Sequence, residues 1–403
     1  MAGGASRLNR YRVDLHVHIG RNSLGQPVKI TGAKDLVFSN IAAEAGRRIG
    51  LHLVGIVDCA SPRVLGDIDE LLDSGDMKPA PGGGIIYGAC GATVILGAEI
   101  EAGLPGGPGA HYLCFMRDID SMKQFSRKLE PFITNIGLST QRARLEPLYL
   151  AELTTDLGGL FIPAHVFTPF KSVYGTCARR MKEVFGSGAP SLISGIELGL
   201  SADTAMADSI GELGGYTFVS NSDAHSLPKI GREFNIMAIE SPSFDELRMA
   251  LARRDGRRVV ANYGLDPRLG KYHVSACEVC NGRFHIDQTE DVRCPVCGSA
   301  RVVVGVSDRL AKIADEPRPD TPLHRPPYRY QVPLEFVPGI GPAKIQALVQ
   351  ALGSELTALH DATLQQLSSV VGEPLAALIL KARTGQLAIE AGGGGTYGKA
   401  RAD

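Results

Sequence analysis

Short apolar runs alternate with segments of helical periodicity between residues 11 and 253, and acidic or histidine side chains recur near the ends of these runs. Strands that alternate with helices favour right-handed crossovers and a mainly parallel sheet. In a parallel barrel, residues at the carboxyl ends of the strands converge on one rim. The pattern therefore predicts a metal site built from Asp58, Glu99, His165, Glu197, Asp223 and His225.

The first apolar run, Tyr11 to Ile19, contains two histidines. His16 and His18 are two residues apart, so in a strand both side chains project from one face and can bind one metal ion. Two core histidines with satisfied hydrogen bonds are the alternative explanation for an isolated His-x-His pair. The recurrence of acids and histidines after later runs favours the metal site.

The types of side chain limit the chemistry of this site. Imidazoles and carboxylates without a thiolate suit Zn²⁺, Mn²⁺ or Fe²⁺, and Mg²⁺ is a further candidate; the set is too large for one tetrahedral ion. We therefore expect two or three divalent metals. A bridging carboxylate, for which Glu99 is the candidate, would hold two ions roughly 3.5–4 Å apart, which suits hydrolysis of a phosphoester.

Composition narrows the remaining classes. The chain has 403 residues, 44% of them apolar, which suffices for one large core and one or two small modules. The net charge of -1 argues against a uniformly basic nucleic-acid coat, so any DNA contact is expected to be local. Met1 to Arg10 has no apolar signal core and no run reaches membrane-spanning length, so we expect a cytoplasmic, nucleoid-associated protein with reduced cysteines and no membrane contact.

Four short motifs then reveal a family resemblance. Asp14 to His18, Gly97 to Glu99, Ala164-His165 and Ser222 to His225 resemble, in that order, the motifs of the PHP (polymerase and histidinol phosphatase) superfamily. The resemblance implies an α/β fold, a distorted (β/α)7 barrel with up to three metals. Two positions depart from the family pattern, because Cys59 follows Asp58 where many members have histidine, and no histidine or aspartate lies between residues 20 and 25.

The resemblance also implies ligand sets and roles. His16, His18, Glu99 and Asp223 match the ligands of one metal, while Glu99, His111 and His165 match those of a second. His225 matches a ligand of a third metal. At this third site, Asp58 is the candidate substitute ligand, and weak binding of the third ion is the alternative. The expected catalytic residues are Asp58, His165, Asp223 and His225.

Beyond the barrel, two pairs of cysteines predict a small metal module. Cys277 and Cys280 are separated by two residues, as are Cys294 and Cys297, and thirteen residues lie between the pairs. This spacing is typical of a four-thiolate zinc ribbon, a closed and therefore structural site. Four free thiols are the alternative.

The rest of the chain predicts a connector, a helical module and a tail. Residues 307–333 are rich in proline and read as an extended linker, which could also lie along a phosphate backbone. Gly339, Gly341 and Lys344 resemble a DNA-binding helix-hairpin-helix motif. The alternative interpretation of this helical module is a protein-docking domain. The expected domains are 10–265 (barrel), 266–306 (zinc ribbon), 307–333 (linker), 334–390 (helix-hairpin-helix) and 391–403 (disordered tail).

This order of modules is similar to that of endonuclease Q and its bacterial relatives. Residues 165–170, 199–203 and 220–232 carry the more specific likeness. The resemblance implies a DNA repair endonuclease that cuts 5′ of a deaminated base (uracil, hypoxanthine, xanthine) or an abasic site. Damaged DNA is thus the expected partner, and no protein partner is indicated.

Such an enzyme must take a base out of the helical stack to read it. Phe170 and Tyr174 are candidates to stack on that base, although Phe170 has the alternative of a core aromatic. Ser201 and Asn221 are candidates to contact its polar edge. The candidates for phosphate binding, with ordinary surface charges as the alternative, are Lys171, Lys229 and Arg232.

Two rival functions leave part of the sequence unexplained. A small-molecule phosphatase of the PHP type would use the same barrel but would need neither the zinc ribbon nor the hairpin module. A non-catalytic DNA-binding adaptor would need only those modules and would leave the acid and histidine set without a purpose.

Overall fold

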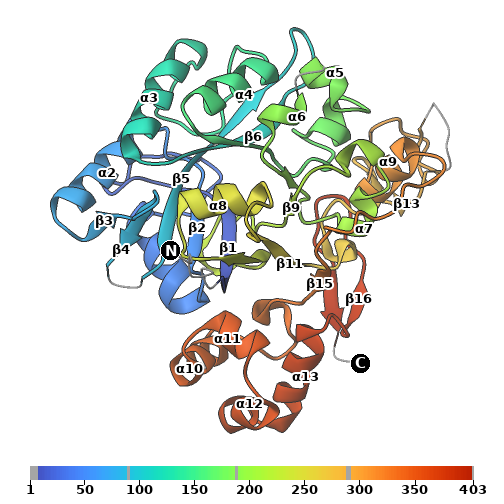
Figure 1. The fold of residues 1–403 in the computed structure, drawn as a ribbon. Helices are drawn as coiled ribbons and strands as arrows, with labels where there is room; N and C mark the ends of the chain where they lie inside the picture. The colour runs from blue at the N-terminus through green and yellow to red at the C-terminus, as the bar shows by residue number, and fades with distance from the viewer. Residues whose placement is uncertain (1–7, 89–90, 187–188, 287–291, 402–403) are drawn as a thin grey trace.

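The main body of the protein is a ten-stranded mixed sheet flanked by helices (Figure 1). The computed structural model describes residues 8–88, 91–186, 189–286 and 292–401. The strand order is β15-β11-β10-β1-β2-β5-β4-β3, with β6 beside β5 and β7 beside β6. The strands are β1 (Asn9–Val17), β2 (Leu53–Ile56), β3 (Met77–Pro79), β4 (Ile85–Tyr87), β5 (Thr93–Ala102), β6 (Ala110–Met116), β7 (Leu160–Pro163), β10 (Phe234–Ile239), β11 (Arg258–Gly264) and β15 (Tyr328–Tyr330).

The expectation of a mainly parallel sheet is wrong. Strands β1, β2 and β5 are parallel, but β10 runs antiparallel to β1, and β6 runs antiparallel to both β5 and β7. For β5 and β6 the reason is local, since only residues 103–109 join them, and a connection without a helix permits a hairpin but no parallel crossover. A separate parallel pair, β8 (Ile196–Glu197) and β9 (Phe218–Val219), lies near β7 and β11.

Helices cover the sheet with apolar faces. In α3, for example, the Asp118 side chain caps the helix by accepting from the Ser121 N–H at 2.9 Å, and Met122, Phe125 and Leu129 recur at helical spacing and are buried. The helices of the body are α1 (Phe38–Glu44, continued by a π-helix at Ala45–Ile49), α2 (Pro62–Asp73), α3 (Ile119–Leu129), α4 (Pro147–Asp156), α5 (Lys182–Phe185), α6 (Ala189–Leu192), α7 (Thr204–Ala207) and α8 (Phe244–Leu251).

Three smaller parts follow the body. A three-stranded sheet, β12 (Ser275–Cys277), β13 (Arg283–Phe284) and β14 (Val302–Val303), carries the cysteines and is followed by α9 (Val306–Ile313). A helical module lies at the bottom of Figure 1, with its own apolar core. Its helices are α10 (Pro342–Leu352), α11 (Glu355–His360), α12 (Leu364–Val371) and α13 (Glu373–Arg383). Strands β16 (Ala388–Glu390) and β17 (Lys399–Arg401) form a terminal hairpin.

Two expectations about irregular segments fail. Residues 307–333 contain most of α9 and also β15, which pairs in parallel with β11, so the proline-rich segment is partly built into the body. The predicted disordered tail, residues 391–403, includes β17, although residues 402–403 lie outside the described ranges. Glycine has no side chain that could pack, but the N–H groups of Gly392 and Gly398 donate hydrogen bonds to Arg268 O and Leu269 O. Amino-acid composition does not predict such backbone hydrogen bonds.

The helical module is fixed to the body by ion pairs. Arg12 on β1 pairs with Asp361, and Arg48 pairs with Glu355 on α11.

Among the helices that the structure describes, none combines the length and apolarity of a membrane span.

Candidate metal centre and pocket

The first group of potential metal ligands lies at the end of β1. The Nε2 atoms of His16 and His18 are 3.2 Å apart, and Asp223 Oδ1 lies 3.6 Å from the first and 3.3 Å from the second. Asp223 reaches this place because Ala224 pairs in parallel with Val17, beyond the edge of the named strands. The two imidazoles are fully buried, and the ligand atoms of the three side chains lie within 4.8 Å of one another.

The second group consists of Glu99, His111 and His165. Antiparallel pairing places His111, near the start of β6, opposite Glu101 on β5, and residue 165 follows β7 on the other side of β6. Glu99 Oε1 lies 2.9 Å from His111 Nδ1, 3.4 Å from His165 Nε2 and 3.4 Å from His16 Nε2. The Glu99 carboxylate therefore lies between the two groups, as a bridging ligand requires.

Two buried carboxylates orient the histidines of β1. Glu197 Oε1 lies 3.0 Å from His16 Nδ1, and Asp58 Oδ2 lies 3.0 Å from His18 Nδ1. Each carboxylate takes the ring nitrogen that faces away from the group, which leaves Nε2 available for a metal. The expectation that Asp58 is a ligand is therefore corrected: its oxygens are used by His18, the Ile19 N–H at 2.7 Å and Ser139.

This arrangement yields a first prediction. Replacing Asp58 with asparagine should weaken metal binding about 10- to 100-fold, because a partner of this kind fixes the tautomer and orientation of its histidine. Metal titration of the metal-free protein, followed by calorimetry, measures the change. Asp69→Asn is the matched control, since that exposed carboxylate pairs with Lys123 on the protein surface. Equal affinity in the two variants would show that Asp58 does not orient His18 for metal.

His225 lies beside the first group without joining it. Its Nδ1 is 3.1 Å from the Asp223 carbonyl oxygen, and its ring centroid is 4.5 Å from that of His18. Burial is the main cause that lowers the pKa of His225 to about 4, so the ring is neutral near pH 7. The described residues contain no three-ligand group that includes His225, and the expected third metal site is not assembled around it.

The backbone and the charges both mark this region as specialised. His165 and Asp223 adopt positive φ angles, 28° and 45°, which are costly for residues other than glycine and concentrate at functional sites. Burial raises the pKa of Glu99, but the nearby His111, Lys29 and His18 outweigh it and hold the pKa well below its ordinary value. The central carboxylate is therefore ionised, as a metal ligand must be.

The two groups fit divalent metals in their chemistry. Imidazole and carboxylate donors converge, and His111 Nδ1 is buried without a hydrogen-bond partner although Glu99 Oε1 is 2.9 Å away. A buried ring nitrogen without a partner is costly unless it binds something else. His16, His18 and Asp223 could hold one ion and His111 and His165 a second, with Glu99 between them.

A pocket of about 580 Å³ opens over these groups. Phe170 lines it with 47% of its surface exposed, so the alternative of a core aromatic is excluded, and its ring packs edge-on against Tyr272 at 5.4 Å. Tyr397, from the segment before β17, also lines the pocket. Lys271 Nζ lies 5.2 Å from the Tyr272 ring and 5.8 Å from the Tyr397 ring. The sequence analysis did not predict that Lys271, Tyr272 and Tyr397 line the pocket. The only indication in the sequence was Tyr397, an aromatic residue within a glycine-rich tail.

Of the other residues predicted to contact a base, one is buried in the core and two line the pocket. Tyr174 is fully buried, stacks on Phe167 and donates to Glu212, so the expectation that it contacts a base is wrong. Ser201 and Asn221 line the pocket, but the Asn221 amide is already bonded to the Leu15 N–H and to Glu197.

The three basic candidates also line the pocket, with different partners. Lys171 pairs with Glu101 and Lys229 with Glu335, each at 2.7 Å, which reduces the charge they offer to DNA. Arg232 Nε donates to Ser222 O at 2.8 Å, so this guanidinium stabilises the loop that carries Asp223.

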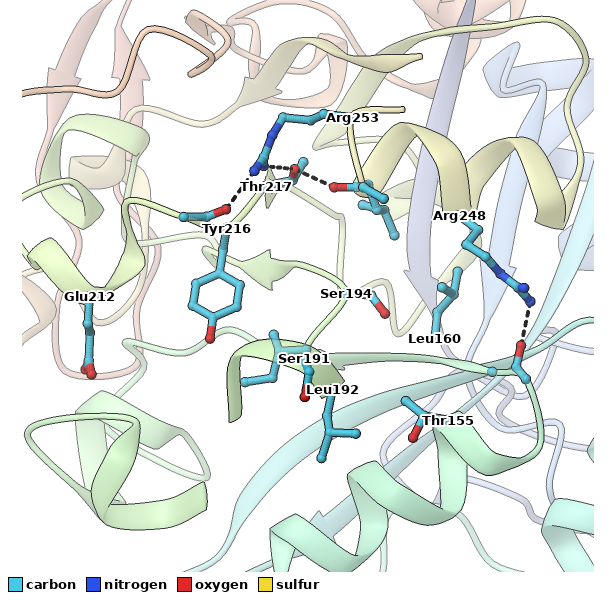
Figure 2. A pocket seen from close by; sticks show the side chains of 16 residues that line it. Thr155, Leu160, Ser191, Leu192, Ser194, Glu212, Tyr216, Thr217, Arg248 and Arg253 are labelled. Atoms are coloured by element: carbon cyan, nitrogen blue, oxygen red, sulfur yellow. Dashed lines mark hydrogen bonds between the residues drawn. The ribbon is translucent and has the colours of Figure 1, made fainter. Parts of the chain in front are cut away.

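A second pocket, of about 520 Å³, lies at the opposite end of the strands (Figure 2). Leu160 and Thr217, at or before the starts of β7 and β9, line it, whereas His165 and Asn221 follow the ends of those strands. Its arginines are bonded to the protein, Arg248 to Gly158 O and Arg253 to Gly215 O. It is separate from the candidate metal centre.

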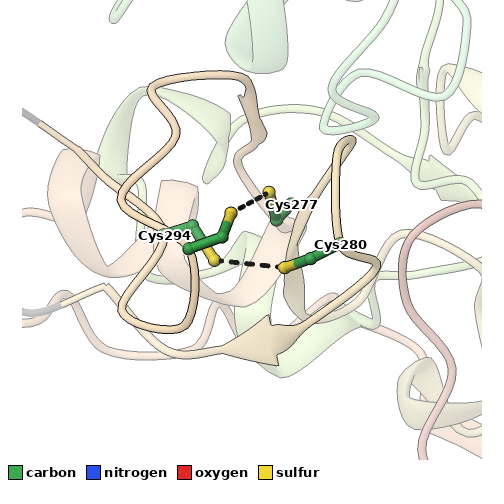
Figure 3. A group of neighbouring side chains, drawn as sticks. Cys277, Cys280 and Cys294 are labelled. Carbon is green, nitrogen blue, oxygen red and sulfur yellow. Dashed lines mark hydrogen bonds between the residues drawn. The ribbon is translucent and has the colours of Figure 1, made fainter.

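The cysteine cluster has the geometry of a metal site (Figure 3). The Sγ atoms of Cys277 and Cys297 are 3.6 Å apart and those of Cys280 and Cys294 are 3.5 Å apart, and all four lie within 4.8 Å of one another. These distances exceed a disulfide bond and approach the roughly 3.8 Å between sulfurs around tetrahedral zinc. The backbone hydrogen bond from Cys280 is the first of the contacts that lower the pKa of Cys277 to about 6, which favours a metal-binding thiolate.

The predicted helix-hairpin-helix motif lies at the start of α10. Gly341 caps the helix, which begins at Pro342, and Gly339 has a φ of 82° that suits glycine. Lys344 Nζ donates to Gly339 O at 2.8 Å and so also braces this loop.

Comparison with known proteins places the chain among its relatives. Uncharacterized protein YqxK of Bacillus subtilis is 46% identical over 97% of this chain and 99% of its own length. Uncharacterized protein MJ0043 of Methanocaldococcus jannaschii is 38% identical over 51% of this chain and 28% of its own length. No protein-family model matches the chain.

Two solved structures resemble almost the whole fold. The lesion-specific endonuclease PfuEndoQ from Pyrococcus furiosus matches with a TM-score of 0.81 and 33% identity, over 98% of this chain and 95% of that chain. Endonuclease Q in complex with a 27-mer duplex substrate that has an abasic lesion at the active site matches with a TM-score of 0.83 and 32% identity, over 98% and 96%.

Fold and site together define a phosphodiester hydrolase, with carboxylates and imidazoles that could hold metal ions gathered at the ends of the strands. Identity above 30% over nearly the entire length then narrows the class. The chain belongs to the endonuclease Q family and is a hydrolase.

Proposed function

We propose that this protein is a DNA repair endonuclease that hydrolyses the phosphodiester on the 5′ side of a deaminated base or an abasic site. The observation that carries the proposal is the pocket in which two potential metal groups share Glu99 and face an aromatic wall of Phe170, Tyr272 and Tyr397. A volume of about 580 Å³ is within the usual range for an organic ligand and suits one nucleotide. The matched endonuclease Q complex contains a duplex with an abasic lesion, which supports DNA as the substrate.

In this proposal each part of the pocket has one task. Two divalent ions would supply an activated hydroxide and stabilise charge on the phosphate during in-line displacement. Glu197 and Asp58 hold the His16 and His18 rings in place, so the ligands need no rearrangement when substrate binds. The aromatic wall receives a base that has left the stack, and Ser201 lies within reach of its polar edge.

Positive charge on the pocket wall complements the strand. Among the residues that the structure describes, no carboxylate lies within 4.0 Å of the Lys271 ammonium, in contrast to Lys171 and Lys229. Lys271 is therefore the better candidate for a phosphate flanking the lesion. We also propose that the four cysteines bind one structural zinc ion and that the loop around Gly339 and Gly341 contacts DNA as a helix-hairpin-helix.

The direct test uses 5′-labelled duplexes with a single uracil, hypoxanthine or abasic site, incubated with the purified protein and Mn²⁺ or Mg²⁺. The expected product ends immediately 5′ of the lesion with a 3′-hydroxyl. Hydrolysis of p-nitrophenyl phosphate without DNA cleavage would instead indicate a small-molecule phosphatase. Binding without cleavage, unchanged by Asp223→Asn, would indicate an adaptor.

The aromatic wall gives a second prediction. Phe170→Ala should lower kcat/KM on the uracil duplex roughly 5- to 150-fold, the effect of losing about 1–3 kcal/mol of stacking on a base. The loss should be much smaller on an abasic duplex, which has no base to stack. Tyr149→Ala is the matched control, because Tyr149 on α4 is also 47% exposed and does not line the pocket. Equal losses on the two substrates would contradict a stacking role.

A further inference from the structure

Lys29 is held against the centre of the candidate metal site. It lies in the loop between β1 and α1, and its side chain is only 11% exposed. The ammonium donates to Glu99 Oε2 at 2.9 Å and to Thr140 Oγ1 at 2.8 Å, and it lies 3.2 Å from His18 Nε2. Thr140 Oγ1 in turn donates to Glu99 Oε2 at 2.8 Å, so the lysine and the threonine both donate hydrogen bonds to the same carboxylate oxygen.

The three N–H donors of this ammonium can be accounted for individually. Glu99 and Thr140 accept two of them, on the wall of the pocket that Lys29 lines. The third points to His18 Nε2, whose lone pair belongs to the first metal group. When an ion takes that lone pair, the third donor needs another acceptor, and an oxygen of a phosphate in the pocket is suited to it.

The surroundings of Lys29 offer no ligand set for another ion. Among the described residues, the three-ligand groups outside the cysteine cluster are His16, His18 and Asp223, and Glu99, His111 and His165. The buried Cys59 thiol donates to Ile56 O, and both Asp58 oxygens are occupied. A cationic side chain therefore lies next to the bridging carboxylate where the family resemblance led us to expect a third metal.

We propose that Lys29 is a catalytic residue that replaces a third metal ion: its ammonium fixes Oε2 of Glu99 and donates to a non-bridging oxygen of the scissile phosphate. The inference rests on the proposed function, because it assigns Lys29 to that same reaction. Negative charge on the phosphoryl oxygens must be balanced during displacement, and a cation already held in place does this without reorganisation. A lysine provides that charge at any metal concentration.

Lys29→Met tests the proposal, since methionine fills a similar volume without charge. We expect kcat on the uracil duplex to fall by about 100- to 1,000-fold, while the dissociation constant for that duplex changes less than about threefold. Elemental analysis should find two barrel ions in both wild type and variant, in addition to one zinc. Lys34→Met is the matched control, because Lys34 lies in the same loop and is exposed.

The measurements distinguish a catalytic Lys29 from a third metal ion and from a lysine without a role in the reaction. Three barrel ions in the wild type, loss of barrel metal from Lys29→Met in proportion to its loss of kcat, or a kcat equal to that of Lys34→Met would each overturn the proposal. Partial recovery in Lys29→Arg, which restores the charge, would support it. If the wild type fails to cleave any lesion duplex, the proposed function fails, whereas the count of barrel ions still tests whether a third ion is present.

Discussion

Replacing Glu99 with glutamine is expected to lower kcat/KM on a uracil duplex by at least about a thousandfold, equivalent to roughly 4 kcal/mol of transition-state stabilisation. The Glu99 carboxylate lies within 3.4 Å of nitrogens from both ligand groups, so one substitution removes an anionic side chain that contacts both. Glutamine preserves the size of the side chain but not its charge. Steady-state kinetics measure the loss of activity, and elemental analysis should show loss of metal from the Glu99 centre with the cysteine-bound zinc retained.

Glu101→Gln is the matched control for this experiment. Glu101 is also a buried carboxylate on β5, two residues further along the strand. Its Oε2 pairs with Lys171 at 2.7 Å and lies 4.0 Å from His111 Nε2, but Glu101 belongs to neither three-ligand group. We expect less than a tenfold change in kcat/KM, and thermal unfolding of both variants should report a folded protein. A Glu99→Gln variant that keeps full metal content and activity would show that the two groups do not share this carboxylate.

The convergence of the ligands was predictable from the sequence although the sheet was not. The argument from strand ends needs β1, β2, β5 and β7 to run in the same direction. The first three are parallel, and β7 has the direction of β5 because β6 runs antiparallel to both, so side chains near the ends of these strands meet at one edge. His111 was also predicted, and it reaches the same edge because β6 runs antiparallel, which puts its start beside the end of β5. Sequence periodicity locates strands but does not give the direction of the next one when the connection is short.

The predictions that failed concern side-chain direction and loops. Asp58 follows β2 as a ligand would, but its carboxylate turns to His18 Nδ1, and chain position alone cannot distinguish a ligand from the residue that orients one. Tyr174 has the residue type of a base-stacking side chain yet is packed in the core. Lys29 and Tyr397 come from loops whose sequence has no periodicity, so only the folded chain shows that they line the pocket.

Loss of the zinc ion proposed for the four cysteines is expected to disable the enzyme on DNA while leaving the metals of the Glu99 centre in place. Cys294→Ser removes one of four converging thiolates, and structural zinc sites contribute on the order of 10–16 kcal/mol to folding of their modules. Lys271 and Tyr272 lie a few residues before β12, which carries Cys277, so unfolding of the module should displace part of the pocket wall. We expect one zinc fewer per chain, faster proteolysis within residues 272–306, and a loss of lesion cleavage of about 100-fold or more.

Cys177→Ser is the matched control for zinc loss, because Cys177 is a free cysteine of the body that belongs to no ligand group among the described residues. This variant should keep its zinc and its activity. Any slow hydrolysis of p-nitrophenyl phosphate, which needs the metals of the Glu99 centre and not the aromatic wall, should be equal in wild type and both variants. Unchanged zinc content in Cys294→Ser would refute the four-thiolate site, and zinc loss with full lesion cleavage would show that the module does not position Lys271 and Tyr272.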